Sequence, residues 1–592
     1  MYDSLTYSMK AAVRALPIIL FVAGLVVCHG LTGGTRPVFS LPVYALLAGA
    51  ALLSWIAPRA GAPASGCLRA TGVLFSYLLV RAAFSPLPYL ARADLFLMLA
   101  CLLVYLLTAT FFVTAELRMR VVYVLMALAG LHSLVGIVQA AQGEDFMLFG
   151  FVRPATGFRA SGLFISPNHL AGYLEIAGVL GLSVAWWSGR KPAVKIVAGY
   201  ATVCCYIGLL LTQSRGGVLC AVFSLLVWMG LTLRASYLGK AHGFGRSLVL
   251  GIGAVAVLLC IGGFFVATHP ELRERLATAL GRDIRVSNWQ AALDQFRLAP
   301  VFGTGAGTHL YFGRLFRRPD LQFDPIHAHN DYLELLAEYG LVGAAGLVVF
   351  LALHAARALR EMGRMARALC ATEEAGRDDL ALVIGALAAL AALGAHSLLD
   401  FNLHIPGNAL VMAFVFGILA RPETIAESHD PATPAAGRGL PVLGGVVLIL
   451  ALLAWPGEFF TERARILLRD EEYPQAIASA TRALRLDPWD PFTCLHLGEA
   501  LRLQAELEPV FADRQTRRQE AEHAFQRGLN LFPQDENLLV RRGQVLDRLK
   551  RFDEAEASFQ AALDADPRLE VLRQFYEKHR ALREPAPPDS AP

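Results

Sequence analysis

Charged residues are scarce in this sequence: they make up only 17% of its 592 positions, whereas 55% are hydrophobic. A water-soluble protein of this length has no core large enough to hide so much apolar surface. The composition therefore excludes an ordinary soluble domain for much of the chain, and it predicts that lipid is the solvent there.

Cysteine is also scarce, with nine residues and no Cys-x-x-Cys pair. Six of them lie within apolar runs, so the sequence excludes a disulfide framework and a thiolate zinc site of the usual spacing. A small-residue cleavage site is missing after the first apolar stretch, from about Ala15 to Cys28. We therefore expect this stretch to remain as the first membrane anchor.

The formal net charge of +4 is the average of two unlike parts. From Glu458 to the C-terminus there are 25 acidic and 20 basic residues, a net charge of −5; the preceding part has 24 and 33, a net charge of +9. We expect a membrane domain over residues 1–457, a soluble domain over 458–584 and a disordered tail over 585–592.

Apolar stretches long enough to cross a bilayer recur along the first part of the chain. They predict an all-α fold, in which a polytopic bundle of about 12–13 transmembrane helices precedes the soluble domain. The expected spans are 15–30, 38–57, 71–90, 93–113, 121–142, 168–187, 193–212, 217–233, 247–267, 340–356, 380–399, 404–420 and 440–456.

The placement of lysine and arginine predicts the orientation of these spans. With the N-terminus in the cytoplasm, each cytoplasmic segment is basic, from Lys10 and Arg14 to Arg421 and Arg438. The opposite side then receives short turns and one long loop, 268–339. The thirteenth span places the soluble C-terminal domain on that same outer side.

The C-terminal domain contains three similar amphipathic segments, which end at Pro488, Pro533 and Pro567. The last two prolines are 34 residues apart, and Leu497-Gly498 and Arg542-Gly543 place a small residue in the first helix of a repeat. This pattern resembles tetratricopeptide repeats, whose period is 34 residues. Such a stack serves either as a docking groove for a protein partner or as a solubilising cap.

Polar residues gather at the predicted outer ends of the spans, where they are costly and indicate function. A lone interfacial arginine is often a snorkelling anchor. Arg215 differs, because its small neighbours Ser214, Gly216 and Gly217 leave its guanidinium room to face a ligand. The candidate site residues are Arg159, Asn168, His169, Arg215, Arg285, His327, His329, Asn330, Asp400 and His404.

Other kinds of site are disfavoured. The run Gly303-Thr304-Gly305-Ala306-Gly307 follows no strand, so we interpret it as a turn rather than a dinucleotide loop. His327 and His329 have no nearby glutamate or cysteine constellation, so we expect no metal. The one Asp-x-Asp sequence, Asp564-Ala565-Asp566, belongs to a repeat. We expect no nucleic-acid partner.

Several guanidinium groups on one side of a membrane suit a phosphate or pyrophosphate, which arginine binds with two hydrogen bonds. A neighbouring histidine can take the proton of an attacking hydroxyl, and arginine stabilises a departing pyrophosphate. Because nucleotides are scarce on the outer side, the donor must already have crossed the membrane. A lipid-linked pyrophosphate sugar fits this description.

The same residues resemble the O-antigen ligase and polymerase superfamily. His329-Asn330, followed after nine residues by Gly340-Leu341-Val342-Gly343, is similar to its signature. The segments 285–289 and 300–307, as well as 166–169 and 214–216, also resemble segments of this superfamily. The resemblance extends over residues 150–420.

The resemblance implies a GT-C-like membrane enzyme that needs no metal or nucleotide cofactor. Its site and repeats would face the periplasm from the bacterial inner membrane. It would move a glycan from undecaprenyl pyrophosphate to lipid A–core, a polysaccharide or a protein. His329 would be the base and Arg215 and Arg285 the pyrophosphate ligands, with further substrate contacts from Arg159, Asn168 and His169.

Two hypotheses of other classes remain. A transporter of lipid-linked glycans needs charged residues near mid-span, for which Arg81 is the clear candidate. A scaffold would use the repeats for assembly and the membrane part as an anchor, although one span anchors a protein well enough.

Overall fold

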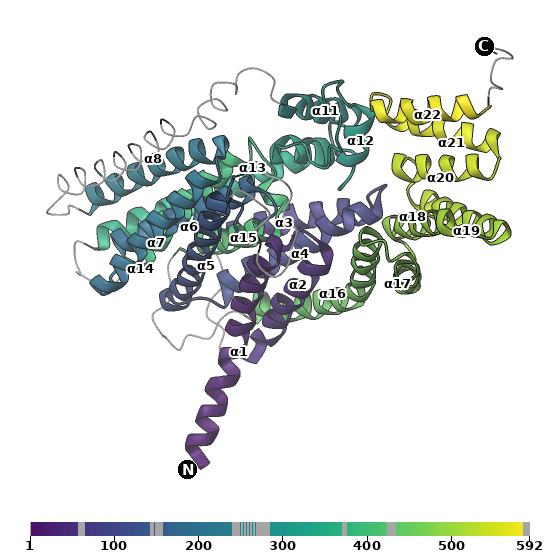
Figure 1. The fold of residues 1–592 in the computed structure, drawn as a ribbon. Helices are drawn as coiled ribbons and strands as arrows, with labels where there is room; N and C mark the ends of the chain where they lie inside the picture. The colour runs from purple at the N-terminus through teal and green to yellow at the C-terminus, as the bar shows by residue number, and fades with distance from the viewer. Residues whose placement is uncertain are drawn as a thin grey trace.

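The computed structural model describes residues 2–56, 65–142, 147, 158–239, 284–369, 376–422 and 434–583, with six isolated positions between 249 and 267. Within these ranges the regular elements are all helices, as Figure 1 shows. The predicted all-α class is therefore confirmed. The predicted tail, 585–592, lies outside the described residues.

Nine described helices are long and apolar enough to cross a membrane, which agrees with a multi-pass membrane protein. Three shorter apolar stretches accompany them: residues Ala15–Gly30 of α1 (Tyr2–Gly30), α2 (Pro37–Leu53) and α15 (Pro406–Ala420). Twelve of the thirteen predicted spans thus coincide with a helix, and 247–267 lies largely outside the described residues. The nine long helices are α3 (Ser65–Ala83), α4 (Pro88–Thr110), α5 (Ala115–Gln142), α6 (Pro167–Trp187), α7 (Pro192–Leu211), α8 (Arg215–Leu238), α13 (Asp331–Ala368), α14 (Arg377–His396) and α16 (Pro434–Arg469).

The third and fourth spans begin and end earlier than the hydropathy predicted. Pro86 and Pro88 separate the two helices, because proline lacks the N–H that a continuing helix would need and is favoured at a helix start. Arg81 consequently lies in the last turn of α3, where it donates to the Gly303 carbonyl oxygen at 2.8 Å. Its interpretation as a mid-span charge was wrong.

Helices α6 and α14 form the centre of the bundle and are the most buried of the nine. They run in opposite directions, so the start of α6 and the end of α14 share one face of the bundle, which we call the site face. At the opposite face Arg190 pairs with Asp378 (2.8 Å) and Glu116 (2.6 Å). Every candidate site residue is at or near a helix end on the site face.

Helix α13 is broken at Gly340, which has φ +66°. Residues just before the turn 303–307 supply hydrogen-bond partners for the backbone at this break. The Leu341 N–H donates to the Pro300 carbonyl oxygen (2.9 Å). The Thr304 N–H donates in turn to the Ala337 carbonyl oxygen (3.1 Å). Residues 303–307 therefore form a turn against the break, and the nine residues after Asn330 are the short helical piece that precedes it.

The C-terminal domain grows directly out of α16, which continues through the predicted boundary at residue 457. Gly498 and Gly543 receive aromatic rings from later helices; a Cβ on Gly498 would lie 2.6 Å from Phe525 Cδ1. Figure 1 shows the repeat helices stacked beside the bundle, with α21 and α22 near α12 (His309–Leu315). They are α17 (Tyr473–Leu486), α18 (Pro491–Leu507), α19 (Phe511–Leu531), α20 (Glu536–Arg548), α21 (Phe552–Ala565) and α22 (Glu570–Arg583).

Replacing Gly340 with alanine is expected to destabilise the membrane domain by about 2 kcal/mol, because an L-residue is strained at this φ. A Cβ there would also lie 2.5 Å from the Gly303 nitrogen. Thermal unfolding of the detergent-solubilised variant should show a lower Tm. Gly72→Ala in α3 is the control, since a Cβ there meets nothing within 4 Å. Equal melting of both variants would contradict the assigned role of the break.

Candidate functional site

His329 and Asp400 form the centre of the site. His329 directly precedes the cap of α13 and has φ +52°, a conformation that a non-glycine residue keeps only when its surroundings hold it. Its Nδ1 lies 3.1 Å from Oδ1 of Asp400, which follows α14 and is fully buried. A carboxylate at Nδ1 leaves Nε2 of the imidazole for proton transfer.

Two neighbours hold the His329 backbone. Asn330 caps α13: its Oδ1 accepts from the N–H groups of Tyr332 (3.1 Å) and Leu333 (3.0 Å). Its Nδ2 donates to the Leu398 carbonyl oxygen at 3.0 Å, and Trp289 Nε1 donates to the His329 carbonyl oxygen at 3.3 Å. The Asn330 side chain thus joins the start of α13 to the turn after α14.

Arg285 brings a positive charge to the same pair. It lies on α11 (Ile284–Leu298), and its Nη2 is 3.9 Å from Asp400 Oδ2. Burial alone would raise the pKa of Asp400, but the hydrogen bond with His329 and the nearby His169 hold that pKa well below its usual range. Asp400 is therefore ionised and able to stabilise a protonated imidazole.

Three of the predicted histidines surround the ring of Phe401. His327 stacks on it with ring centroids 4.3 Å apart, while His329 and His169 contact it edge-on at 4.8 and 4.9 Å. The structure thus brings together residues from α6, the long loop and the turn after α14. Phe401 was missed by the sequence analysis, since a phenylalanine between two spans has no distinctive pattern.

Two further acidic residues are partners of His327 and His404. Glu334 Oε1 is 2.7 Å from His327 Nδ1 and 3.4 Å from His404 Nε2, and Asp331 Oδ1 is 3.1 Å from His404 Nδ1. Burial alone would lower the pKa of His404, but Glu334 and Asp331 raise it well above its ordinary value. Both acids were missed because acidic residues in the first turn of a helix are ordinary partners of the helix dipole.

The surroundings of His327 differ from the expectation that no glutamate lies near it. His327 does have a nearby glutamate, and the ligand atoms of His327, Glu334 and His404 all lie within 4.8 Å of one another. Two imidazoles and a carboxylate are donors that zinc accepts, yet direct hydrogen bonds already join these groups. Metal independence remains a prediction. A second such group among the described residues consists of Glu175, Cys220 and His396.

Arg215 is the first residue of α8, in a tight turn on the site face. Ser214 caps the helix by accepting from the Gly217 N–H at 3.2 Å. The two glycines allow close packing: a Cβ on Gly216 would lie 3.3 Å from Leu399 Cδ1, and one on Gly217 would lie 2.7 Å from Ala171 Cβ. The Arg215 turn therefore sits on the end of α14, directly before Asp400.

Arg159 and Asn168 lie at the same corner. Arg159 Nε donates to the Thr212 carbonyl oxygen at 3.0 Å, and its Nη2 donates to Asn168 Oδ1 at 3.1 Å. Thr212 is part of the turn that leads to Arg215. Arg159 thus contacts the turn before Arg215, and Arg285 lies near Asp400. Both contacts lie at the C-terminal end of α14.

An apolar cavity of about 220 Å³ lies beside the histidine cluster, by which we mean His169, His327, His329 and His404 with their acidic partners Asp331, Glu334 and Asp400. It has one polar end, where Asp94, Asp331, Glu338 and His404 line it. Since Asp331 and His404 also belong to the cluster, the cavity connects the site to the apolar interior of the bundle. Its apolar walls come from α3, α4, α13 and α15 and include Leu74, Leu97, Met98, Leu335, Phe350 and Met412.

Comparisons with known protein families match two segments of the chain. Residues 200–348 match a family model described as O-antigen ligase, a shorter range than the 150–420 of the sequence resemblance, and residues 537–569 match a tetratricopeptide repeat model. No curated protein matches the chain significantly.

Among solved structures, the tetratricopeptide repeat domain of Arabidopsis OM64 is similar to part of this chain. The match covers 22% of this chain and 98% of that domain, at 18% identity and a TM-score of 0.20. The ligase match includes Arg215, Arg285 and His329. The family models thus show that residues 200–348 of the membrane part are similar to O-antigen ligases and that residues 537–569 are similar to a tetratricopeptide repeat.

Proposed function

We propose that the membrane domain is a glycosyltransferase that moves a glycan from undecaprenyl pyrophosphate to an acceptor on the periplasmic face of the bacterial inner membrane. The observation that carries this proposal is the His329–Asp400 pair beside Arg285. His329 and Arg285 lie within the matched ligase segment, and Asp400 lies outside it. The distribution of lysine and arginine supports the orientation.

In the proposed reaction, Nε2 of His329 takes the proton of an acceptor hydroxyl as its oxygen attacks the anomeric carbon of the donor. The bond between that carbon and the phosphate oxygen breaks, and the electron pair leaves with undecaprenyl pyrophosphate. Asp400 stabilises the imidazolium that forms. Arg285 and Arg215 offset the negative charge that develops on the leaving group.

The apolar cavity supports a lipid-linked substrate. Most of its lining side chains are hydrophobic, and His404 lines both the cavity and the site. A prenyl or acyl chain would leave water on entering such a cavity, while its polar head stayed near His329.

Polymerisation of repeat units and glycosylation of a protein use the same chemistry, so they are the second candidates. The repeat domain beside the site suits a polysaccharide or protein acceptor as well as lipid A–core. The transporter hypothesis loses its main support, because Arg81 lies at a helix end and binds the Gly303 carbonyl.

His329→Ala is expected to lower transfer by about 100-fold or more, because general-base catalysis contributes that much. Asp400→Asn should lower it through loss of the charge that orients His329. The assay is transfer by purified protein from a defined undecaprenyl-pyrophosphate glycan, with lipid A–core, free glycan and protein acceptors offered in parallel. Full activity of correctly inserted His329→Ala protein would remove His329 from the mechanism.

Arg285→Ala is expected to raise the KM for the donor and to lower kcat, because the guanidinium would contact the pyrophosphate before and during bond cleavage. Arg285→Lys should recover little, since lysine cannot form the paired hydrogen bonds of arginine. Arg297→Ala on the same helix is the control: its side chain is 72% exposed and lies 2.5 Å from Asp294, three residues earlier on that helix. Equal kinetics of the Arg285 and Arg297 variants would remove Arg285 from donor binding.

Chelation should leave transfer unchanged if the site needs no metal. The measurement compares initial rates before and after treatment with EDTA and phenanthroline, followed by metal analysis of the purified protein. Loss of activity that zinc or another divalent ion restores would contradict metal independence, and His327, Glu334 and His404 would then be the first ligands to test.

A further inference from the structure

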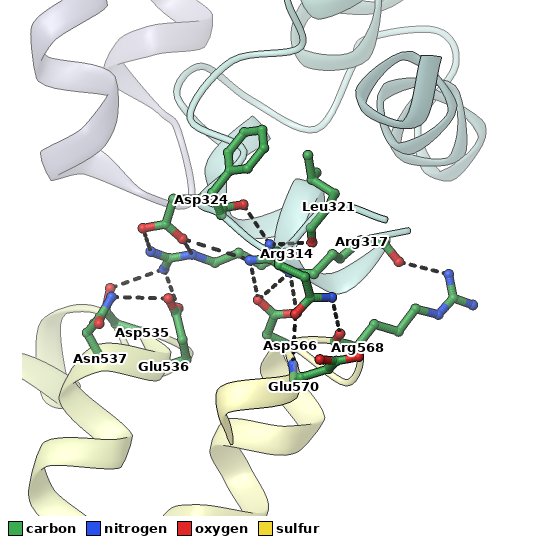
Figure 2. A network of polar contacts seen from close by, with 12 residues as sticks. Arg314, Arg317, Leu321, Asp324, Asp535, Glu536, Asn537, Asp566, Arg568 and Glu570 are labelled. Atoms are coloured by element: carbon green, nitrogen blue, oxygen red, sulfur yellow. Dashed lines mark hydrogen bonds and ion pairs between the residues drawn. The ribbon is translucent and has the colours of Figure 1, made fainter. Parts of the chain in front are cut away.

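The repeat domain is fastened to the long loop by two buried arginines, which Figure 2 shows from close by. Arg314 lies in α12 and Arg317 in the turn that follows, and both are almost inaccessible to water. Their partners come from the repeats and from the loop itself. We call this contact the loop clamp and define it by Arg314, Arg317, Asp535, Glu536 and Asp566.

Arg317 and Asp566 form the more enclosed half of the clamp, with both side chains fully buried. Arg317 Nε lies 2.8 Å from each carboxylate oxygen of Asp566, and its Nη2 lies 2.6 Å from Oδ2. Arg317 Nη1 donates to the carbonyl oxygens of Leu321 (2.9 Å) and Phe323 (2.6 Å). One guanidinium therefore organises the loop and binds the repeats at once.

Arg314 forms the other half. It makes two parallel hydrogen bonds of 3.0 Å to Asp324 in the loop. On the side of the repeats it reaches Glu536 at 2.5 Å and Asp535 at 3.3 Å, and Asp535 also caps α20 through the Leu538 N–H. The clamp thus grips the repeats at helix ends, whose backbone is fixed by capping.

The same loop segment is also tied to α11. Arg318 Nη2 lies 2.6 Å from Asp294 Oδ2, and Ser287 Oγ donates to Asp320 Oδ2 at 2.7 Å. Ser287 and Asp294 are two turns apart on α11, so these contacts hold the helix along much of its length. Arg285, which meets Asp400, and Trp289, which holds the His329 carbonyl, lie on this helix.

The repeats are anchored to the bundle at a second place. Arg92 near the start of α4 pairs with Glu458 and Asp487, and the rings of Tyr89 and Phe492 lie 5.5 Å apart. The domain is therefore held at its base by the membrane bundle and near its far end by the loop. Two such attachments fix the loop relative to the bundle through the repeats.

We propose that the repeat domain positions α11: the Arg317–Asp566 contact holds residues 314–324 of the long loop, and through them α11, so that Arg285 stays beside Asp400. The expected change in transfer kinetics rests on the proposed function. The expected change in the order of α11 does not depend on it. Arg317 and Asp566 are positioning residues. The repeats then serve the reaction itself, in addition to any partner that they dock.

The test uses Asp566→Asn in the full-length protein. The matched control is Asp553→Asn, in the first turn of α21, the helix that Asp566 follows. Asp553 is 88% exposed and pairs with Arg583. Hydrogen exchange should become faster in α11 of Asp566→Asn and stay unchanged in α6 and α14, and Asp553→Asn should match the parent protein. Unchanged protection of α11 would overturn the proposal, whether or not the protein transfers glycan.

Kinetics separate positioning from partner docking. Asp566→Asn should lower transfer at least about tenfold with a raised donor KM, and it should add little in an Arg285→Ala background, because the two changes act on one group. Arg317→Lys, which keeps the charge, provides a second variant should Asp566→Asn fold poorly. A loss confined to protein acceptors, or full additivity with Arg285→Ala, would overturn the proposal. Absence of transfer in the parent protein would refute the proposed function instead.

Discussion

Lipid offers no hydrogen bonds to a peptide backbone, and the form of this molecule depends on that constraint. Every interruption of a spanning helix must be satisfied by the protein itself. The break at Gly340 shows how: residues 300–305 bring their own backbone groups to the carbonyls and N–H groups that α13 leaves open. Tyr77 adds a hydrogen bond to the Tyr339 carbonyl oxygen at 2.7 Å.

The site follows from the same constraint, because helix ends are where backbone and charged side chains can meet away from lipid. Asp400 leaves the end of α14, His329 precedes α13, and Arg215 begins α8. Packing these three ends together creates a polar corner in an apolar bundle. The low polarity around these helix ends strengthens the electrostatic attraction between Asp400 and His329 and so stabilises their arrangement.

Much of the fold could be predicted from local patterns. Hydropathy predicted spans that coincide with helices, and the alternation of basic segments placed His329, Arg215 and Asp400 at a common face. The features of the helices that the sequence did not predict correctly also have local causes. Pro86 and Pro88 separate α3 from α4, so α3 ends before its hydropathy does, and the glycines around Arg215 pack closely against Leu399 and Ala171.

Pairings between distant residues could not be predicted. Asp400 is separated from His329 by 71 positions and Asp566 from Arg317 by 249, and only packing decides which carboxylate meets which base. Glu334 was hidden for a different reason, because its position in a first helical turn already explains an acidic residue. Sequence patterns thus selected the candidate histidines and arginines together with Asp400, whereas Glu334 and the pairing of each base with its carboxylate came from the tertiary structure.

The continuity of α16 has a consequence for how this protein can evolve. The helix has 36 residues, which corresponds to a length of about 54 Å, and it joins the bundle to the repeats without a linker. Inserting one residue into it would turn the whole repeat domain by about 100° about the helix axis. The contacts at Arg92 and at Arg317 would then no longer be satisfied together. The joint is therefore expected to vary in residue type while its length stays constant, unlike the junctions of most multidomain chains, where insertions accumulate.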